Sequence, residues 1–92
     1  MPRTVKKPEE RREEIVKAAR FLFQTREYDK TTMQDVMNTL GIAKGTIYYY
    51  FSSKEELLEA VVNDIVDEAT GKMLRLLDET SGNALEKFRI LI

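Results

Sequence analysis

A short stretch near the middle of the chain carries side chains suited to recognising phosphate and base edges. Consecutive helix positions lie about 100° apart, so the adjacent tyrosines Tyr48, Tyr49 and Tyr50 cannot all face a core. If Ile47 and Phe51 form the buried pair at i and i+4, Tyr49 lies near the opposite pole of the helix. The exposed face then consists of Lys44, Gly45, Thr46, Tyr48 and Tyr49.

This face combines a cation, hydroxyl donors, a flat apolar ring and a residue without a side chain. The set suits a helix that enters a major groove, where side chains meet phosphates and base edges. Gly45 costs helix propensity unless another molecule approaches the backbone closely. The residues therefore predict that DNA is that close neighbour.

Two short helices around a glycine turn are predicted to position this face. Thr31 and Thr32 are both candidate caps for the first of them, because each has a capping-box partner three residues later, Gln34 or Asp35. That helix is expected to run to about residue 40, with Gly41 supplying the turn and the next helix beginning near residue 44. Its apolar face consists of Met33, Val36, Met37 and Leu40. The arrangement is a helix-turn-helix.

Flanking segments extend this unit into an all-α chain. A first helix is predicted from Pro8, with Ile15, Ala18, Ala19, Leu22 and Phe23 at helical spacing. A capping box over 53–56 opens a fourth helix that continues to about Leu77. After a break at 80–83, residues 84–92 begin a fifth amphipathic helix. The fold class predicted is a three-helix helix-turn-helix domain followed by a long fourth helix and the start of a fifth.

The predicted organisation has three parts. Residues 1–8 form a basic N-terminal arm, residues 9–53 the helix-turn-helix DNA-binding domain, and residues 54–92 a linking helix and the start of a truncated C-terminal domain. The apolar residues near the end of the sequence have no later partner within it: Leu85, Phe88, Leu91 and Ile92. This unpartnered face predicts that the 92 residues are part of a larger architecture.

Composition narrows the classes of function. The chain has no cysteine and no histidine, so a cysteine nucleophile, a Ser-His-Asp triad, a disulfide framework and a thiolate or imidazole metal site are excluded. No cofactor or metal site is predicted. The sequence has no apolar run of membrane-spanning length and no secretory signal at its start, so the cytoplasm is the expected compartment.

Charge is unevenly distributed along the chain. The formal net charge is −1, but residues 1–54 carry eleven Lys or Arg against seven Asp or Glu, whereas residues 55–92 carry four against nine. A basic N-terminal half that contains the candidate recognition helix fits a protein with one face toward phosphate. Ordinary solvated helix charge is the alternative explanation of this modest bias.

With these elements in place, the stretch from about residue 9 to residue 62 resembles the N-terminal DNA-binding domain of TetR-family transcriptional regulators. The resemblance rests on IVKAARFLF in the first helix, Tyr28 with the two threonines, the turn Leu40-Gly41-Ile42, the block AKGTIYYYF and the closing SSKEELL. Together these segments are specific, although a glycine between two apolar helices is common by itself.

The resemblance implies a role for individual residues at the DNA interface. Thr32 corresponds to a helix start that meets a phosphate, although a plain capping role stays open. Tyr50, which lies toward the buried face, is either a phosphate contact or mainly structural. The implied DNA-contacting set is Thr32, Lys44, Gly45, Thr46, Tyr48, Tyr49, Tyr50 and Lys54. Lys54 is the implied phosphate contact at the start of the fourth helix, and Tyr49 is the contact that its exposure supports most directly.

Two departures from the family pattern bear on the backbone. Glu27 stands where the family usually has a glycine that ends the first helix, so a left-handed glutamate there costs about 1 kcal/mol or more. Ala43 stands at the cap of the third helix, where serine is common, and lacks a side-chain acceptor. The turn that follows the first helix is therefore predicted to be strained or built differently.

The leading hypothesis is a sequence-specific binder of double-stranded DNA that acts as a transcriptional regulator. By resemblance it is a ligand-responsive repressor that works as a homodimer on a palindromic operator, with a small-molecule effector bound by a C-terminal domain largely missing here. A helical protein-interaction module without DNA binding is the alternative, since tyrosines are also favoured at protein interfaces. An enzyme is not expected, because acidic pairs such as Glu55 and Glu56 are explained by capping and the helix dipole.

Overall fold

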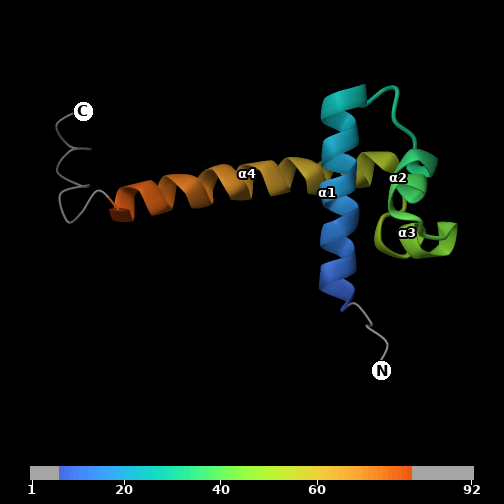
Figure 1. Ribbon diagram of the computed structural model, residues 1–92, viewed down its shortest axis with the longest axis horizontal. Helices are drawn as coiled ribbons and strands as arrows, with labels where there is room; N and C mark the ends of the chain where they lie inside the picture. The colour runs from blue at the N-terminus through green and yellow to red at the C-terminus, as the bar shows by residue number, and fades with distance from the viewer. Residues whose placement is uncertain (1–6, 80–92) are drawn as a thin grey trace. The chain divides into compact units, whose positions relative to one another are not determined.

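The computed structural model describes residues 7–79, in which the chain is helical and contains no strand. The elements are α1 (Pro8–Arg26), α2 (Met33–Leu40), α3 (Lys44–Tyr50) and α4 (Lys54–Glu79), as Figure 1 shows. This confirms the predicted all-α fold of a helix-turn-helix followed by a long fourth helix. Most of the predicted basic arm, the break at 80–83 and the fifth helix at 84–92 lie outside the described residues.

The chain divides into two compact units, Met1–Val62 and Asn63–Ile92, and each is described by itself. The first contains α1, α2, α3 and the opening turns of α4. The second contains the remaining turns of α4, whose apolar side chains Ile65, Val66, Met73, Leu74 and Leu76 are exposed. The predicted division between residues 53 and 54 stays a prediction.

Local sequence signals account for the helix ends. Pro8 occupies the first turn of α1, where a missing N–H costs nothing, and Glu9 and Glu10 complement the helix dipole. Gly41 ends α2 in the left-handed conformation, with φ 67° and ψ 34°, and its N–H donates to the Met37 carbonyl. At α3, Ala43 provides no side-chain cap, as its type predicts.

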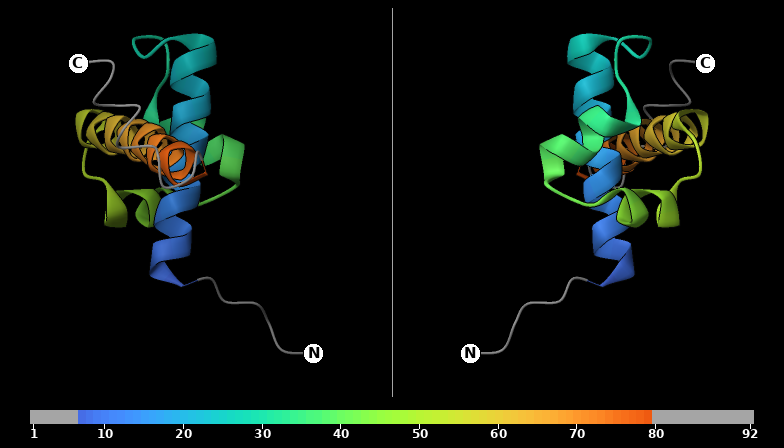
Figure 2. Two further views of the ribbon diagram at one scale, coloured as in Figure 1. Left: turned by 90° about the vertical axis from the view of Figure 1, so that its left-hand side faces the viewer. Right: turned by 90° about the vertical axis from the view of Figure 1, so that its right-hand side faces the viewer.

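Glu27 is the residue with positive φ other than glycine within the described residues. Its φ is 74° and its ψ 148°, a combination outside the ordinary left-handed basin and normal only for glycine. Of the two alternatives that the sequence left open, a strained turn or one built differently, the structure has the strained one. From here residues 27–32 leave the end of α1 and return alongside it to the start of α2 (Figure 2).

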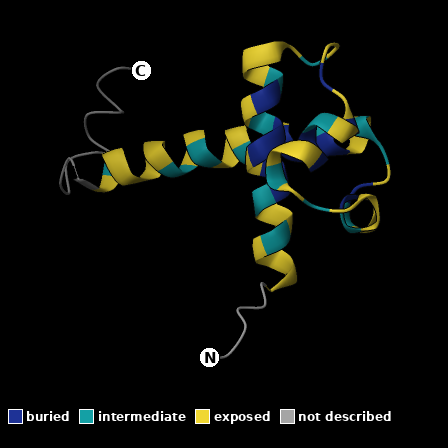
Figure 3. Cartoon of the chain, turned by 45° about the vertical axis from the view of Figure 1, so that its right-hand side comes forward, coloured by how far each residue is buried: buried dark blue, intermediate teal, exposed yellow. Residues whose placement is uncertain are grey.

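The core of the first unit forms where α1 meets the other helices, and Figure 3 shows buried residues gathered there. It consists of Ile15, Val16, Ala18, Ala19 and Leu22 of α1, Met33, Val36 and Met37 of α2, Ile47 and Phe51 of the α3 region, and Leu57, Ala60 and Val61 of α4. Each helix contributes side chains at i, i+3 or i+4, so an amphipathic pattern in the sequence becomes a shared interior. The fixed core leaves the opposite faces of α2 and α3 available to solvent.

Candidate nucleic-acid interface

The start of α2 is held by a reciprocal capping box between Thr32 and Asp35. The Asp35 N–H donates to Thr32 Oγ1 at 3.0 Å, and the Thr32 N–H donates to Asp35 Oδ2 at 2.9 Å. Of the two candidate caps, the structure therefore selects Thr32. Thr31 is buried instead, with its hydroxyl donating to the Glu27 carbonyl at 2.8 Å. Thr32 remains exposed, so its hydroxyl lies at the surface beside the start of α2.

The capping box also sets the charge at this helix end. The hydrogen bond from the Thr32 N–H lowers the pKa of the Asp35 carboxyl below its ordinary value, and Arg26 contributes in the same direction. Arg26 Nη1 lies 3.5 Å from Asp35 Oδ1. The Asp35 carboxylate therefore accepts a hydrogen bond from the cap and pairs with Arg26. Its negative charge beside Thr32 is partly balanced by these two contacts.

The exposed face of α3 is the one that the helical geometry predicts, except that Thr46, which was expected on it, is only partly exposed. Ile47 and Phe51 are 0% and 1% exposed, whereas Tyr49 is 79% exposed. Tyr48 is exposed as well, together with Lys44 and Gly45, while Thr46 and Tyr50 are partly buried. The prediction that Tyr49 stands at the pole opposite the core is therefore confirmed.

Aromatic and cationic contacts restrict the side chains on this face. The rings of Tyr49 and Tyr50 lie edge to face with centroids 4.9 Å apart, and Tyr50 packs against the core. Lys44 Nζ lies 5.9 Å from the centroid of the Tyr48 ring, within the range of a cation–π contact. Side chains restricted in this way lose less conformational freedom when they bind a ligand.

Gly45 is not required by the packing of the protein. A Cβ built at this position meets no atom within 4 Å. Its backbone is helical, so the conformation does not demand glycine either. A glycine in an open position on the exposed face of α3 is consistent with close approach of an external molecule.

A shallow cavity of about 430 Å³ joins the start of α2 to α3 and to the first residue of α4. It brings together Thr32, Lys44, Tyr48 and Lys54 of the predicted contact set, and its other lining residues are Asp29, Thr31, Met33, Gln34 and Met37. Two lysines and a helix N-terminus face this space, and both features attract anions. Gly45, Thr46, Tyr49 and Tyr50 are not among its lining residues.

Lys54 makes contacts that the sequence did not predict. Its ammonium donates to the carbonyl oxygens of Tyr28, at 2.8 Å, and Thr31, at 3.0 Å. It also lies 4.1 Å from the centroid of the Tyr28 ring. Burial and the nearby carboxylates of Glu55 and Asp29 raise the pKa of the Tyr28 phenol, so the ring beneath the ammonium stays neutral at physiological pH.

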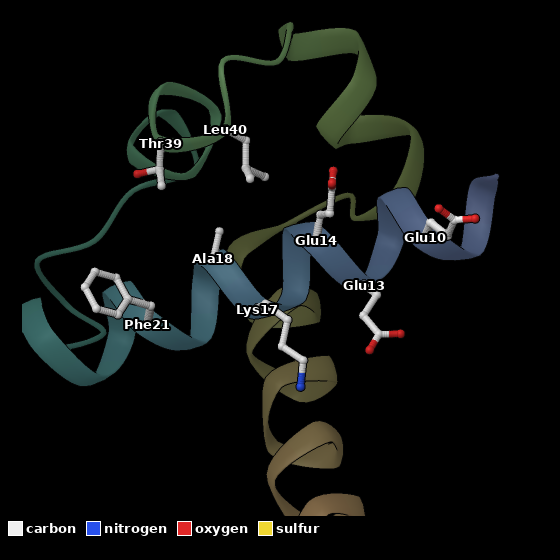
Figure 4. A pocket seen from close by; sticks show the side chains of 8 residues that line it. All are labelled: Glu10, Glu13, Glu14, Lys17, Ala18, Phe21, Thr39 and Leu40. Carbon is white, nitrogen blue, oxygen red and sulfur yellow. The ribbon is translucent and has the colours of Figure 1, made fainter. Parts of the chain in front are cut away.

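A larger cavity of about 610 Å³ lies elsewhere in the same unit, between α1 and the end of α2. Figure 4 shows its apolar part, formed by Ala18, Phe21 and Leu40, and the acidic side chains Glu10, Glu13 and Glu14 along α1. Phe21 is 61% exposed. Three carboxylates against one lysine, Lys17, make this cavity unfavourable for phosphate. The anion-attracting surface is therefore the one at α2 and α3.

Two properties of residues 7–79 bear on other functions. Within residues 7–79, no group of three or more Asp or Glu side chains is placed to hold a metal ion. Across that same range, the helices lack the combination of length and apolar character that crossing a membrane requires.

A known protein family matches the part of the sequence that contains α1 from Ile15 onward, α2, α3 and the start of α4. The family described as "Bacterial regulatory proteins, tetR family" matches residues 15–61, about half of the chain. The HTH-type transcriptional repressor KstR2 of Mycolicibacterium smegmatis is 36% identical over 86 residues, which is 94% of this chain and 42% of that protein. The chain thus spans less than half the length of this relative.

Two solved structures are also similar to this chain. A TetR/AcrR-family transcriptional regulator from Thermobifida fusca has a TM-score of 0.66 and 42% identity over 75% of this chain and 38% of its own. A TetR-family regulator from Pectobacterium atrosepticum has a TM-score of 0.69 and 33% identity over 96% of this chain and 45% of its own. The matched family consists of transcriptional regulators and not enzymes, as the composition predicts. The chain belongs to the TetR family of DNA-binding, helix-turn-helix transcriptional regulators.

Proposed function

We propose that this chain reads an operator by placing α3 in the major groove of double-stranded DNA, and that the protein represses transcription by occupying that operator. The observation that carries the proposal is the exposed face of α3, where Tyr49 is 79% exposed, next to a cavity that joins Lys44 to the capped start of α2. Two large exposed rings side by side on one helix, Tyr48 and Tyr49, indicate a binding surface.

The residues divide by the part of DNA that they are proposed to meet. Thr32, Lys44 and Tyr48 contact phosphates from the cavity side, since hydroxyls and ammonium groups are the usual phosphate donors. Tyr49 and Thr46 meet base edges or the neighbouring backbone, and Gly45 allows the helix to approach. The Tyr50 ring packs edge to face against the Tyr49 ring, and the Tyr50 phenol contacts the sugar-phosphate backbone of the DNA.

We further propose that the protein acts as a homodimer, because a palindromic operator presents two half-sites about one helical turn apart, roughly 34–36 Å, and each requires one recognition helix. In this proposal the protein works in the cytoplasm, and a small-molecule effector binds its C-terminal part. Binding of that effector changes DNA affinity by shifting α4, which begins at Lys54 and is separated by three residues from the end of α3 in the helix-turn-helix.

A protein-interaction module is the second candidate, and one observation favours it. Val62, Val66, Met73, Leu74 and Leu76 of α4 are exposed apolar side chains. Exposed apolar surface of this kind marks an interface with another protein surface. This apolar surface of α4 is compatible with DNA binding by α3. The two candidate functions therefore differ in whether α3 contacts DNA.

Fluorescence anisotropy of a labelled, mixed-sequence DNA duplex distinguishes them. We expect the chain to bind at low salt and to lose affinity steeply as salt rises, because phosphate contacts release counterions. Tyr49→Ala and Lys44→Ala should weaken binding while circular dichroism shows an intact helical fold. No binding at low salt by the folded chain would refute the DNA proposal and leave the interaction module.

A further inference from the structure

The peptide group that joins Thr31 to Thr32 is held at both of its ends. Its carbonyl, on Thr31, accepts a hydrogen bond from Lys54 Nζ at 3.0 Å. Its N–H, on Thr32, donates to Asp35 Oδ2 at 2.9 Å. This peptide opens α2, so its orientation sets the direction of the Thr32 hydroxyl and of the free N–H groups in the first turn.

Lys54 is well restrained in this arrangement. A second of its three ammonium protons goes to the Tyr28 carbonyl at 2.8 Å, and the Tyr28 ring lies beneath the charge at 4.1 Å. The Tyr28 carbonyl also accepts from the Thr31 N–H at 3.1 Å, so the turn and the lysine share one acceptor. With two protons committed to carbonyls, at most one remains for a phosphate.

We propose that Lys54 is a positioning residue of the DNA interface, which acts by orienting the Thr31–Thr32 peptide at the start of α2 rather than by neutralising a phosphate. The inference rests on the proposed function, since it concerns how the α2 end is presented to DNA. It replaces the phosphate contact that family resemblance implies for Lys54. It makes the first residue of α4 part of the support of α2, across 23 residues of sequence.

Salt dependence separates the two roles, because each neutralised phosphate adds about 0.9 to the slope of log affinity against log salt. The probe is a fluorescein-labelled, mixed-sequence DNA duplex, and the variants are Lys54→Met and Lys44→Met. We expect Lys54→Met to bind several-fold more weakly with an unchanged slope. Lys44→Met should lose about 0.9 from the slope per protomer. A loss of that size in Lys54→Met, or an unchanged affinity, would overturn the proposal.

Two controls address folding and charge. Val16→Ala truncates a core residue of α1 that is 4% exposed, and it should lose stability without losing duplex affinity. Lys54→Arg keeps the charge and supplies donors to the same carbonyls, so it should restore binding toward that of the parent chain.

Amide NMR tests the positioning role without DNA. In Lys54→Met the Thr32 and Asp35 amide signals should shift and the Thr32 N–H should exchange faster, whereas Lys44→Met leaves them in place. Unchanged Thr32 and Asp35 signals would overturn the inference. If Lys54→Met does not fold, NMR of the lysine ammonium groups in the parent chain tests the same role. Addition of the duplex should shift the signal of Lys44 Nζ and leave that of Lys54 Nζ unchanged. Absence of duplex binding by the folded parent chain refutes the proposed function instead, while the amide result stands by itself.

Discussion

Tyr49 and Tyr50 are adjacent in the sequence, yet one ring is in solvent and the other is against the core, with centroids 4.9 Å apart and planes at 88°. Tyr50 therefore links the exposed ring to the interior. The two residues have different predicted effects when each is truncated.

Tyr49→Ala should weaken DNA binding and leave stability nearly unchanged, because the side chain is 79% exposed. Loss of a neutral hydrogen bond to a base edge corresponds to about 0.5–1.5 kcal/mol, and loss of one to a backbone phosphate to about 1.5–3 kcal/mol, so affinity should fall by roughly twofold to a hundredfold. Tyr50→Ala should lower both stability and affinity. Urea unfolding and duplex anisotropy measure the two quantities, and a large stability loss in Tyr49→Ala would contradict the assignment.

Gly45→Ala should affect stability and binding in opposite directions. Alanine is favoured over glycine in a helix by about 0.5–1 kcal/mol, and a Cβ at this position meets no protein atom within 4 Å. The variant should therefore unfold at a higher urea concentration. If α3 enters a groove, the added methyl meets DNA and lowers affinity. Tighter binding together with higher stability would argue against close approach at Gly45.

Thr32→Ala should destabilise the chain by about 1 kcal/mol, the usual cost of losing an N-cap side chain. Thr32→Ser keeps the hydroxyl and should lie close to the parent chain. DNA affinity should fall in the alanine variant more than its stability loss explains, because the hydroxyl is also a proposed phosphate donor. Equal duplex affinities for the two folded variants would leave Thr32 a plain cap.

Asp35 gives the stability of the chain a defined acid dependence. Its pKa is lowered in the folded state below the ordinary value of 3.8, first by the hydrogen bond from the Thr32 N–H. A depressed folded-state pKa contributes stability above 3.8 that is lost as the pH falls through the folded-state value. In Asp35→Asn the free energy of unfolding should depend less on pH in this acid range. Urea unfolding from about pH 6 to about pH 2 measures it, and identical acid limbs for the two chains would contradict the role of Asp35.

Glu27→Gly should stabilise the chain, since φ 74° and ψ 148° are normal only for glycine. Relief of the strain is worth roughly 1–3 kcal/mol, offset by about 0.4–1 kcal/mol for the greater freedom of glycine in the unfolded chain. The lost ion pair with Lys30, at 3.3 Å and largely exposed, matters little. Glu27→Ala is the matched control, because alanine removes the carboxylate without relieving the backbone. A gain in Glu27→Ala equal to that in Glu27→Gly would show that the backbone is not the cause.

Interactions between close neighbours in the sequence were predictable from residue types. Pro8 at the start of α1, Gly41 at the end of α2 and the Ile47 and Phe51 pair all lie as the local pattern indicates. Strain at Glu27 was one of the two alternatives expected, because a glutamate stands at a turn where the family usually has glycine.

Contacts between distant segments were not predictable in the same way. The sequence left Thr31 and Thr32 as equal candidates for the cap, and packing decided between them by burying Thr31 against α1. The resemblance pointed Lys54 toward phosphate, whereas the fold directs its ammonium to carbonyls 23 and 26 residues away.

The sequence by itself determined where the helices lie and which face of α3 is exposed, because capping bonds and helical periodicity connect residues only three or four positions apart. Only the tertiary structure decided which threonine caps α2, what Lys54 holds, and that Thr32, Lys44 and Tyr48 share one cavity. These outcomes depend on how α1, α2 and α4 pack, and packing follows from the joint shape of side chains far apart in the chain.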